Sequence, residues 1–136
     1  DESLRIERRF LVDEVGVDPA EFRFVDGSGL SSDDLVTSSA IIRLLRWINA
    51  PARRGAFSAV MATPGQPGTL HQRLVDLGPR LRAKTGTING VNALSGFVSG
   101  KSGSYRYFSI IVNHHTGDSD EAERIIDTLV TELADF

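Results

Sequence analysis

The stretch Arg82–Val98, RAKTGTINGVNALSGFV, decides the fold. The dipeptide Asn89-Gly90 at its centre is a strong signal for a two-residue β-hairpin, because both residues tolerate the positive φ that such a turn needs. We therefore expect two antiparallel strands, residues 81–88 and 91–99. The gap 100–104 is too short for a crossover helix, so residues 105–113 should add a third antiparallel strand.

Helices are expected on both sides of this three-stranded meander. Thr37 can cap a helix whose apolar residues recur at i, i+3, i+4 and i+7, which indicates one buried face. The predicted fold class is α/β of the α+β kind, an antiparallel sheet meander flanked by helices. The other expected helices are residues 3–15, a short one capped by Thr69 that carries Leu70, Leu74 and Leu77, and a last one capped by Asp118 or Ser119 with an apolar stripe that includes Ile125 and Leu129.

The last expected strand, YRYFSIIVN at 105–113, is apolar on both faces. Such a strand is typically covered on both sides inside a sheet. The meander nevertheless places it at an edge, and an exposed edge pairs readily with another strand. We therefore expect a partner for it: further sequence of the same protein, a second copy of the chain, or a separate chain.

Composition excludes several classes of function. The 136 residues carry a net charge of −3, which argues against nucleic-acid binding because phosphates require a basic surface. No apolar run approaches the roughly 20 residues of a membrane-spanning helix. Cysteine is absent from the sequence, so disulfides and thiolate metal sites are excluded. A hydrophobic content of 40% fits one globular domain, or one lobe of a larger domain.

Lys84-Thr85-Gly86-Thr87 is the first candidate site. Of the 15 basic residues in the sequence, only Lys84 and Lys101 are lysines. A lysine supplies a compact positive charge, the threonines supply hydroxyl donors, and the glycine allows a ligand to lie close to the strand backbone. The N–H that follows the glycine can donate to a developing oxyanion. The pattern predicts an anion clamp beside an acyl-transfer centre; an edge strand protected by a lysine is the structural alternative.

Two other groups of residues are candidates for a chemical role. In the loop 26–34, DGSGLSSDD, Asp26 and Ser31 are expected to bond local amides and stabilise a turn. Ser28 lacks the Gly-x-Ser-x-Gly surroundings of a nucleophile elbow. The histidines at 71, 114 and 115 have no metal-ligand spacing and are interpreted as solvated or structural. A hydrolase built on Ser28 and His71 would need those side chains within hydrogen-bond reach.

Three blocks in order resemble the C-terminal part of the D-Ala-D-Ala carboxypeptidases of the S13 peptidase type, the class C low-molecular-mass penicillin-binding proteins. The blocks are VDGSGLSSDD at 25–34, TPGQPGTLHQRL at 63–74 and RAKTGTINGVNALSGFV at 82–98, and FSIIVNHH at 108–115 continues the resemblance. It implies the C-terminal lobe of a β-lactamase/DD-peptidase-like transpeptidase fold. It also implies serine acylation of peptidoglycan stem peptides that end in D-Ala-D-Ala, binding of β-lactams, no metal or organic cofactor, and a periplasmic or extracellular location. Endopeptidase cleavage of peptide crosslinks is a second activity that the resemblance leaves open.

The resemblance further implies a role for each residue of the candidate site. Lys84 would attract the terminal carboxylate of the substrate, and the Thr85 and Thr87 hydroxyls would bond it. The backbone N–H of Thr87, after Gly86, would form half of the oxyanion hole. The residues expected to border the substrate are Ser28, Leu30 and Ile88.

The family's Ser-x-x-Lys and Ser-x-Asn motifs are absent from the sequence. Leu81 and Val98 stand three positions before the two lysines, and no asparagine has a serine two positions earlier. We therefore expect residues 1–136 to be the C-terminal part of a penicillin-binding DD-peptidase domain whose N-terminal part supplies the nucleophile and a strand that pairs with residues 105–113. The isolated chain should be inactive. A non-catalytic module of the same fold, which binds peptidoglycan or a protein, is the alternative.

Overall fold

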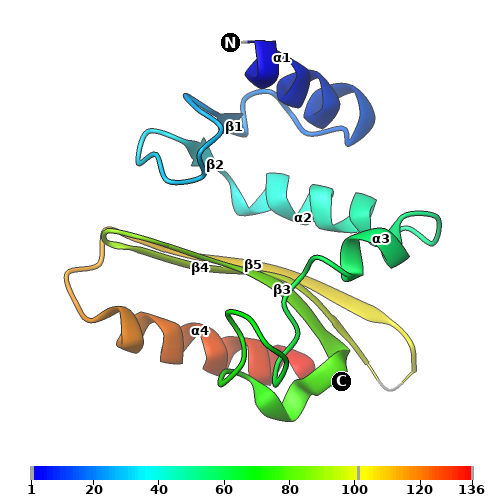
Figure 1. The fold of residues 1–136 in the computed structure, drawn as a ribbon, viewed down its shortest axis with the longest axis vertical. Helices are drawn as coiled ribbons and strands as arrows, with labels where there is room; N and C mark the ends of the chain where they lie inside the picture. Colours follow the sequence, from blue (N-terminus) through cyan, green and yellow to red (C-terminus); the bar gives the residue numbers. More distant parts are fainter. Residues whose placement is uncertain (1, 101, 136) are drawn as a thin grey trace.

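The computed structural model describes residues 2–100 and 102–135. A three-stranded antiparallel sheet lies between helix α2 (Ser38–Ile48) on one face and helix α4 (Ser119–Ala134) on the other (Figure 1). The sheet has the order β3-β4-β5, with β3 at Leu81–Ile88, β4 at Val91–Ser99 and β5 at Tyr105–Asn113. The three strands have the bounds that the sequence predicted. Within the described residues no helix is long and apolar enough to span a bilayer.

The register between β3 and β4 depends on two glycines. Gly90 has a φ of +69° in the two-residue turn that closes the hairpin, and Ile88 pairs with Val91 on either side of it. Gly96 lies opposite Ala83, and a Cβ added there would lie 2.2 Å from the Arg82 carbonyl oxygen. Only glycine therefore allows β3 and β4 to approach this closely.

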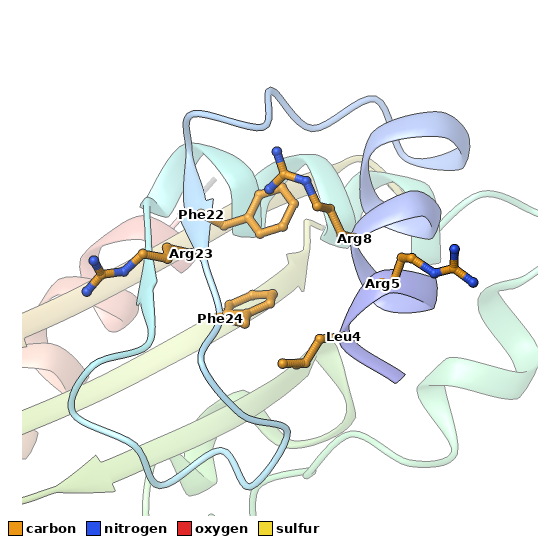
Figure 2. A pocket seen from close by; sticks show the side chains of 6 residues that line it. All are labelled: Leu4, Arg5, Arg8, Phe22, Arg23 and Phe24. Atoms are coloured by element: carbon orange, nitrogen blue, oxygen red, sulfur yellow. The ribbon is translucent and has the colours of Figure 1, made fainter. Parts of the chain in front are cut away.

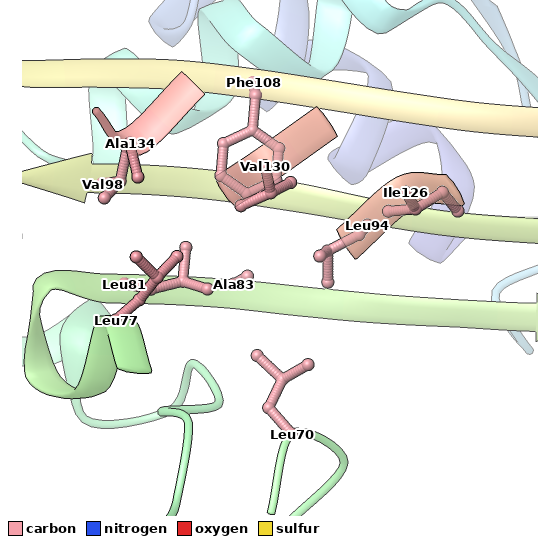
Figure 3. Packing of buried hydrophobic residues seen from close by; sticks show 10 residues of the cluster. All are labelled: Leu70, Leu77, Leu81, Ala83, Leu94, Val98, Phe108, Ile126, Val130 and Ala134. Atoms are coloured by element: carbon pink, nitrogen blue, oxygen red, sulfur yellow. The ribbon is translucent and has the colours of Figure 1, made fainter. Parts of the chain in front are cut away.

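The face covered by α4 contains the larger hydrophobic core, which Figure 3 shows between the sheet and the helix. The Asp118 side chain caps α4 by accepting a bond from the Asp120 N–H at 3.1 Å, which confirms one of the two predicted caps. Ile125 and Leu129 are 54% and 51% exposed, so the predicted apolar stripe is buried along only one of its sides. The buried members of this core are Leu70, Leu77, Leu81, Ala83, Leu94, Val98, Phe108, Ile126, Val130 and Ala134.

Helix α2 covers the opposite face of the sheet, mainly over β5. The Thr37 hydroxyl caps it by accepting a bond from the Ala40 N–H at 3.1 Å, as predicted. The buried Asn49 at its end donates through Nδ2 to the Tyr107 hydroxyl at 2.8 Å. β5 is thus covered on both faces, as expected, yet in the described part of the chain it is an edge strand.

The N-terminal segment packs beyond α2 (Figure 1). Helix α1 (Glu2–Arg9) continues as a π-helical turn, Phe10–Glu14, which agrees with the helix expected for residues 3–15. The short strands β1 (Phe22–Arg23) and β2 (Leu35–Val36) pair across the loop 24–34, a hairpin that the sequence did not predict. A small second core of Leu11, Val17, Phe22 and Ala40 holds these elements together.

The prediction of a helix after Thr69 is wrong. Residues 69–74 form turns, and Leu74 has a left-handed backbone with a φ of 54°. A 3₁₀ helix, Val75–Arg80, follows and is kinked at Gly78. Leu70 is fully buried and Leu77 is 8% exposed. The leucines stand at helical spacing because these two side chains hold an irregular segment in the core, not because the segment is a helix. A short helix α3 (Arg54–Ser58) was also not predicted.

Candidate functional site

β3 is paired along its whole length on one side and at only one residue on the other. On the outer side, Ala62 and Ala83 exchange two backbone bonds of 2.9 and 3.1 Å. In an antiparallel strand the N–H and C=O of alternate residues point to the same side. The backbone groups of Thr85 and Thr87 therefore point to the same outer side as those of Ala83. No other described strand pairs with β3 there, so at this open edge the N–H groups of Thr85 and Thr87 have no backbone partner among the described residues.

The Lys84 ammonium lies at this open edge. The lysine is exposed, and its side chain starts on the α2 face of the sheet, opposite Ser95. Its Nζ donates to the Thr85 carbonyl oxygen. Because that carbonyl points outward, the positive charge sits beside the free backbone groups of the edge.

Thr85 and Thr87 project from the other face of β3, the face that carries the buried Leu81 and Ala83. Thr85 is half-buried and Thr87 is exposed, so both hydroxyls lie past the end of the covered core. One ammonium, two hydroxyls and outward N–H groups are thereby gathered in four consecutive residues. This set of donors suits a carboxylate adjacent to a carbonyl that develops negative charge.

Gly86 differs from Gly96 because the fold itself does not require it. A Cβ added at Gly86 would lie 3.6 Å from the Ala93 Cβ, an ordinary van der Waals contact. Its φ is not in the positive range. The missing side chain thus leaves room beside the open edge that the packing of this chain does not use. Ile88, the last residue of β3, is half-buried next to the hairpin turn.

A buried polar cluster lies behind the end of this strand. Asn92 is 1% exposed and pairs directly opposite Thr87. Its Oδ1 is 2.7 Å from His115 Nε2 and accepts a bond of 3.1 Å from the Ser119 hydroxyl, whereas its Nδ2 has no partner. His115 Nδ1 lies 3.2 Å from the Gly117 carbonyl oxygen. Sequence reasoning missed Asn92, although a polar amide in the strand VNALSGFV is unusual enough to have drawn attention.

The loop 24–34 forms a turn stabilised by its own side chains. Asp26 Oδ1 accepts bonds from the Ser28 hydroxyl at 2.6 Å and the Ser28 N–H at 2.8 Å, and these bonds lower the pKa of the Asp26 carboxyl. Ser31 accepts a bond from the Asp33 N–H at 3.2 Å. The turn-stabilising roles expected of Asp26 and Ser31 are confirmed.

Ser28 and Leu30 make no hydrogen bond with Lys84 or the rest of β3 in the described part of the chain. Leu30 is 72% exposed, and Ser28 accepts a bond from the Leu30 N–H at 3.1 Å. No hydrogen bond or ion pair connects the described residues of loop 24–34 to Lys84–Thr87. Their role in binding substrate therefore stays a prediction.

A hydrolase built on Ser28 and His71 is excluded by the layers of the fold. The Ser28 hydroxyl is bonded to Asp26 in a loop beyond α2, whereas His71 follows Leu70, which is buried on the α4 face. In Figure 1 the loop between β1 and β2 lies beyond α2, on the opposite side of the sheet from α4. Among the described residues, no group of three or more His, Cys, Asp or Glu side chains could hold a metal ion.

A cavity of about 260 Å³ lies between α1 and β1, away from β3. Figure 2 shows the Arg5 and Arg23 guanidinium groups pointing away from its apolar floor of Leu4, Phe22 and Phe24. Arg5 pairs with Glu2 at 2.6 Å, and Arg23 donates to the Asp33 carbonyl oxygen at 3.3 Å. These two charges are engaged elsewhere, and the third arginine that lines the cavity, Arg8, lies over the Phe22 ring at 5.3 Å from its centroid.

The sequence profile of the D-Ala-D-Ala carboxypeptidase 3 (S13) family matches residues 3–134. The chain belongs to this family. It is 36% identical over 129 residues to a D-alanyl-D-alanine carboxypeptidase of Actinomadura sp. (strain R39), covering 90% of this chain and 23% of that protein. It is 34% identical over 109 residues to carboxypeptidase DacB of Mycolicibacterium smegmatis, covering 74% of this chain and 24% of that protein. The chain thus spans about a quarter of the length of the curated relatives it matches.

Solved structures of other proteins have the same fold. Penicillin-binding protein 4 from Haemophilus influenzae, complexed with a β-lactam, superposes with a TM-score of 0.77 at 26% identity, over 92% of this chain and 31% of that chain. A predatory endopeptidase from Bdellovibrio bacteriovorus, in complex with an immunity protein, gives a TM-score of 0.81 at 21% identity, over 96% of this chain and 36% of that chain. The predicted fold class, the C-terminal lobe of a DD-peptidase, is confirmed.

Proposed function

We propose that this chain supplies the substrate-binding strand of a serine-type D-Ala-D-Ala carboxypeptidase that acts on peptidoglycan stem peptides and is acylated by β-lactams. Membership of the S13 family supports the reaction class, and the β-lactam in the H. influenzae structure supports the inhibitor class. The observation that carries the proposal is the open edge of β3, where the Lys84 ammonium lies beside the outward backbone groups of Thr85 and Thr87.

In the proposed mechanism, the terminal carboxylate of the substrate accepts bonds from the Lys84 ammonium and from the hydroxyls of Thr85 and Thr87. The Thr87 N–H donates to the scissile carbonyl oxygen, where negative charge develops as the serine attacks. The C-terminal D-alanine leaves, and water then hydrolyses the acyl-enzyme. Ser28, Leu30 and Ile88 border the rest of the stem peptide. No metal or organic cofactor takes part in this mechanism.

The nucleophile and its base come from outside these 136 residues, since the sequence contains neither Ser-x-x-Lys nor Ser-x-Asn. We place both motifs in an N-terminal part of the same domain, which also supplies a strand for the free edge of β5. The short share of the relatives' length that the chain covers supports this arrangement. A second copy of the chain on the β5 edge is the competing occupant. The site would act in the periplasm or outside the cell, where peptidoglycan lies.

Labelled penicillin tests the proposal directly. We expect the longest encoded form of the protein to form a covalent adduct and the 136-residue chain to form none, as read by intact mass. Lys84→Ala in the longer form should slow acylation by about 10- to 100-fold, because a charged hydrogen-bond donor is lost. Arg124→Ala, on the exposed side of α4, removes the same charge and should leave the rate unchanged.

Two results would overturn the proposal: acylation of the 136-residue chain alone, or a Lys84→Ala rate equal to that of the unchanged protein. Binding of a stem peptide by the longest form without any turnover or adduct would instead favour the non-catalytic binding module.

A further inference from the structure

We infer that Asn92, held by His115, is a positioning residue for Thr87: its buried amide N–H orients the Thr87 hydroxyl so that this hydroxyl donates to the substrate carboxylate. This inference rests on the proposed function of Thr87. It adds two residues, Asn92 and His115, that lie on the side of β3 away from its open edge and touch no substrate themselves.

The first support is the pairing of Thr87 with Asn92 across β3 and β4. The two residues are directly opposite, so their side chains share one face of the sheet. Because Ala83 bonds outward to Ala62, every second residue of β3, including Thr87, also points its backbone groups away from β4. Thr87 and Asn92 therefore form a non-hydrogen-bonded pair, the kind in which opposed side chains come closest, with Cα atoms about 4.5 Å apart.

The second support is the orientation of the Asn92 amide. Two groups surround its Oδ1: the Ser119 hydroxyl donates at 3.1 Å, and His115 Nε2 lies at 2.7 Å. The other nitrogen of His115 faces the Gly117 carbonyl oxygen at 3.2 Å, so both ring nitrogens point at oxygen acceptors and both must carry a proton in this arrangement. This arrangement leaves Nδ2, with two N–H donors, buried and without a partner. The Thr87 hydroxyl is the polar group directly across the strand pair, and in the proposed arrangement it turns to accept from Nδ2.

The third step concerns the direction of the hydroxyl proton. A carboxylate offers only acceptors, so a threonine that binds it must donate. When Asn92 Nδ2 donates to Thr87 Oγ1, the hydroxyl accepts on its inner side and its own proton is directed outward. An ordered donor loses less rotational freedom on binding than a freely turning hydroxyl does.

The cluster is anchored at three places, which keeps Asn92 in position. The backbone N–H of His115 donates to the Gly90 carbonyl oxygen at 3.2 Å, so this residue also holds the tip of the β3–β4 hairpin. Ser119 begins α4. His114 has a left-handed φ of 53°, which turns the chain so that His115 faces the sheet. A displacement of the hairpin tip would move Thr87 together with it.

The test uses the longest encoded form of the protein and two peptides, one ending in D-Ala-D-Ala and the same peptide with its terminal carboxylate converted to an amide. Asn92→Asp keeps the shape and the oxygen that faces His115 but removes the N–H donors. We expect kcat/KM for the carboxylate peptide to fall about tenfold, mainly through KM, with little change for the amide peptide.

A double-mutant cycle separates positioning from general damage. In a Thr87→Val background, which has no hydroxyl to orient, Asn92→Asp should have no further effect, whereas in Thr87→Ser its effect should persist. Additive losses in the Thr87→Val background, or equal losses on both peptides, would overturn the inference. Should Asn92→Asp fail to fold, by melting temperature, His115→Gln takes its place in the same cycle with the same criteria. A Thr87→Val protein with unchanged kcat/KM would overturn the proposed role of Thr87 itself, which is a different and distinguishable failure.

Discussion

Alanine at Gly86 and alanine at Gly96 should have opposite consequences for the protein. The Cβ of Gly96→Ala would lie 2.2 Å from the Arg82 carbonyl oxygen and 2.7 Å from the Ala83 Cβ. The clash is with backbone, which cannot rotate away, so β3 and β4 must separate locally. We expect a loss of about 3 kcal/mol, the upper end of the usual cost of overpacking. For a chain of this size that corresponds to a drop in melting temperature of roughly 10 °C.

Gly86→Ala should leave the free energy of unfolding within about 0.5 kcal/mol of the unchanged protein, since its Cβ meets the Ala93 Cβ at an ordinary 3.6 Å. In the longest encoded form of the protein, its effect should fall on acylation by penicillin, which we expect to slow about tenfold or more because the ligand loses its close approach to the strand. The free energy comes from urea denaturation, and the acylation rate from intact mass against time.

The pair gives two independent ways to contradict the reasoning. If Gly86→Ala destabilises the protein as much as Gly96→Ala does, the packing of β3 against β4 is not as described. If Gly86→Ala is stable and is acylated at the unchanged rate, no ligand lies against this part of β3, and the candidate site is misplaced.

Two further expectations concern stability and pH. Arg73→Lys should lower the free energy of unfolding, measured in urea, by about 1–3 kcal/mol. The half-buried Arg73 guanidinium bonds the Asp127 and Glu123 carboxylates of α4 at 2.8–3.0 Å, and lysine cannot reproduce these forked bonds. The control Arg124→Lys, on the exposed face of α4, should change the free energy little. Asp26 should titrate by NMR below the usual value of about 3.9, and Ser28→Ala should raise its pKa again. Because the pKa of Asp26 is lower in the folded state, its contribution to stability is present above its unfolded pKa and is lost as the pH falls through its folded pKa. The free energy of unfolding should therefore fall less steeply with decreasing pH in Asp26→Asn than in the unchanged protein, and a steeper fall would contradict this.

Local signals predicted the sheet well and the connecting segments poorly. The bounds of β3, β4 and β5 follow from a two-residue turn and a gap too short for a helix, and both features are local in sequence. The pairing of β1 with β2 is not, because two-residue strands carry no periodicity and meet only through the small core around Phe22. The helix expected after Thr69 failed because leucines at helical spacing also fit an irregular segment that anchors Leu70 in the core.

The chemistry of the candidate site was readable from four residues, but its geometry was not. The bridge between Ala62 and Ala83 sets how much of the outer side of β3 stays open, and no residue near Lys84 in the sequence predicts that bridge. The place of Asn92 depends on strand register, which becomes visible only once the partners are known. The sequence indicates a solvated or structural role for His115, and in the structure this side chain is a hydrogen-bond partner of the buried Asn92.

Ala62 occupies the outer side of β3 at Ala83, which limits how far a docked peptide can extend. A peptide that adds antiparallel to this edge has its C-terminal end directed toward Ala62 and finds room along Thr85–Ile88 alone, about 13 Å at 3.3 Å per residue. A chain that extends past Thr85 would collide with the backbone at Met61 and Ala62, because Ala62 pairs antiparallel with Ala83. On the proposed function, a bound peptide would therefore have to end at Ala62, so the edge would accept the C-terminus of a chain and not its interior.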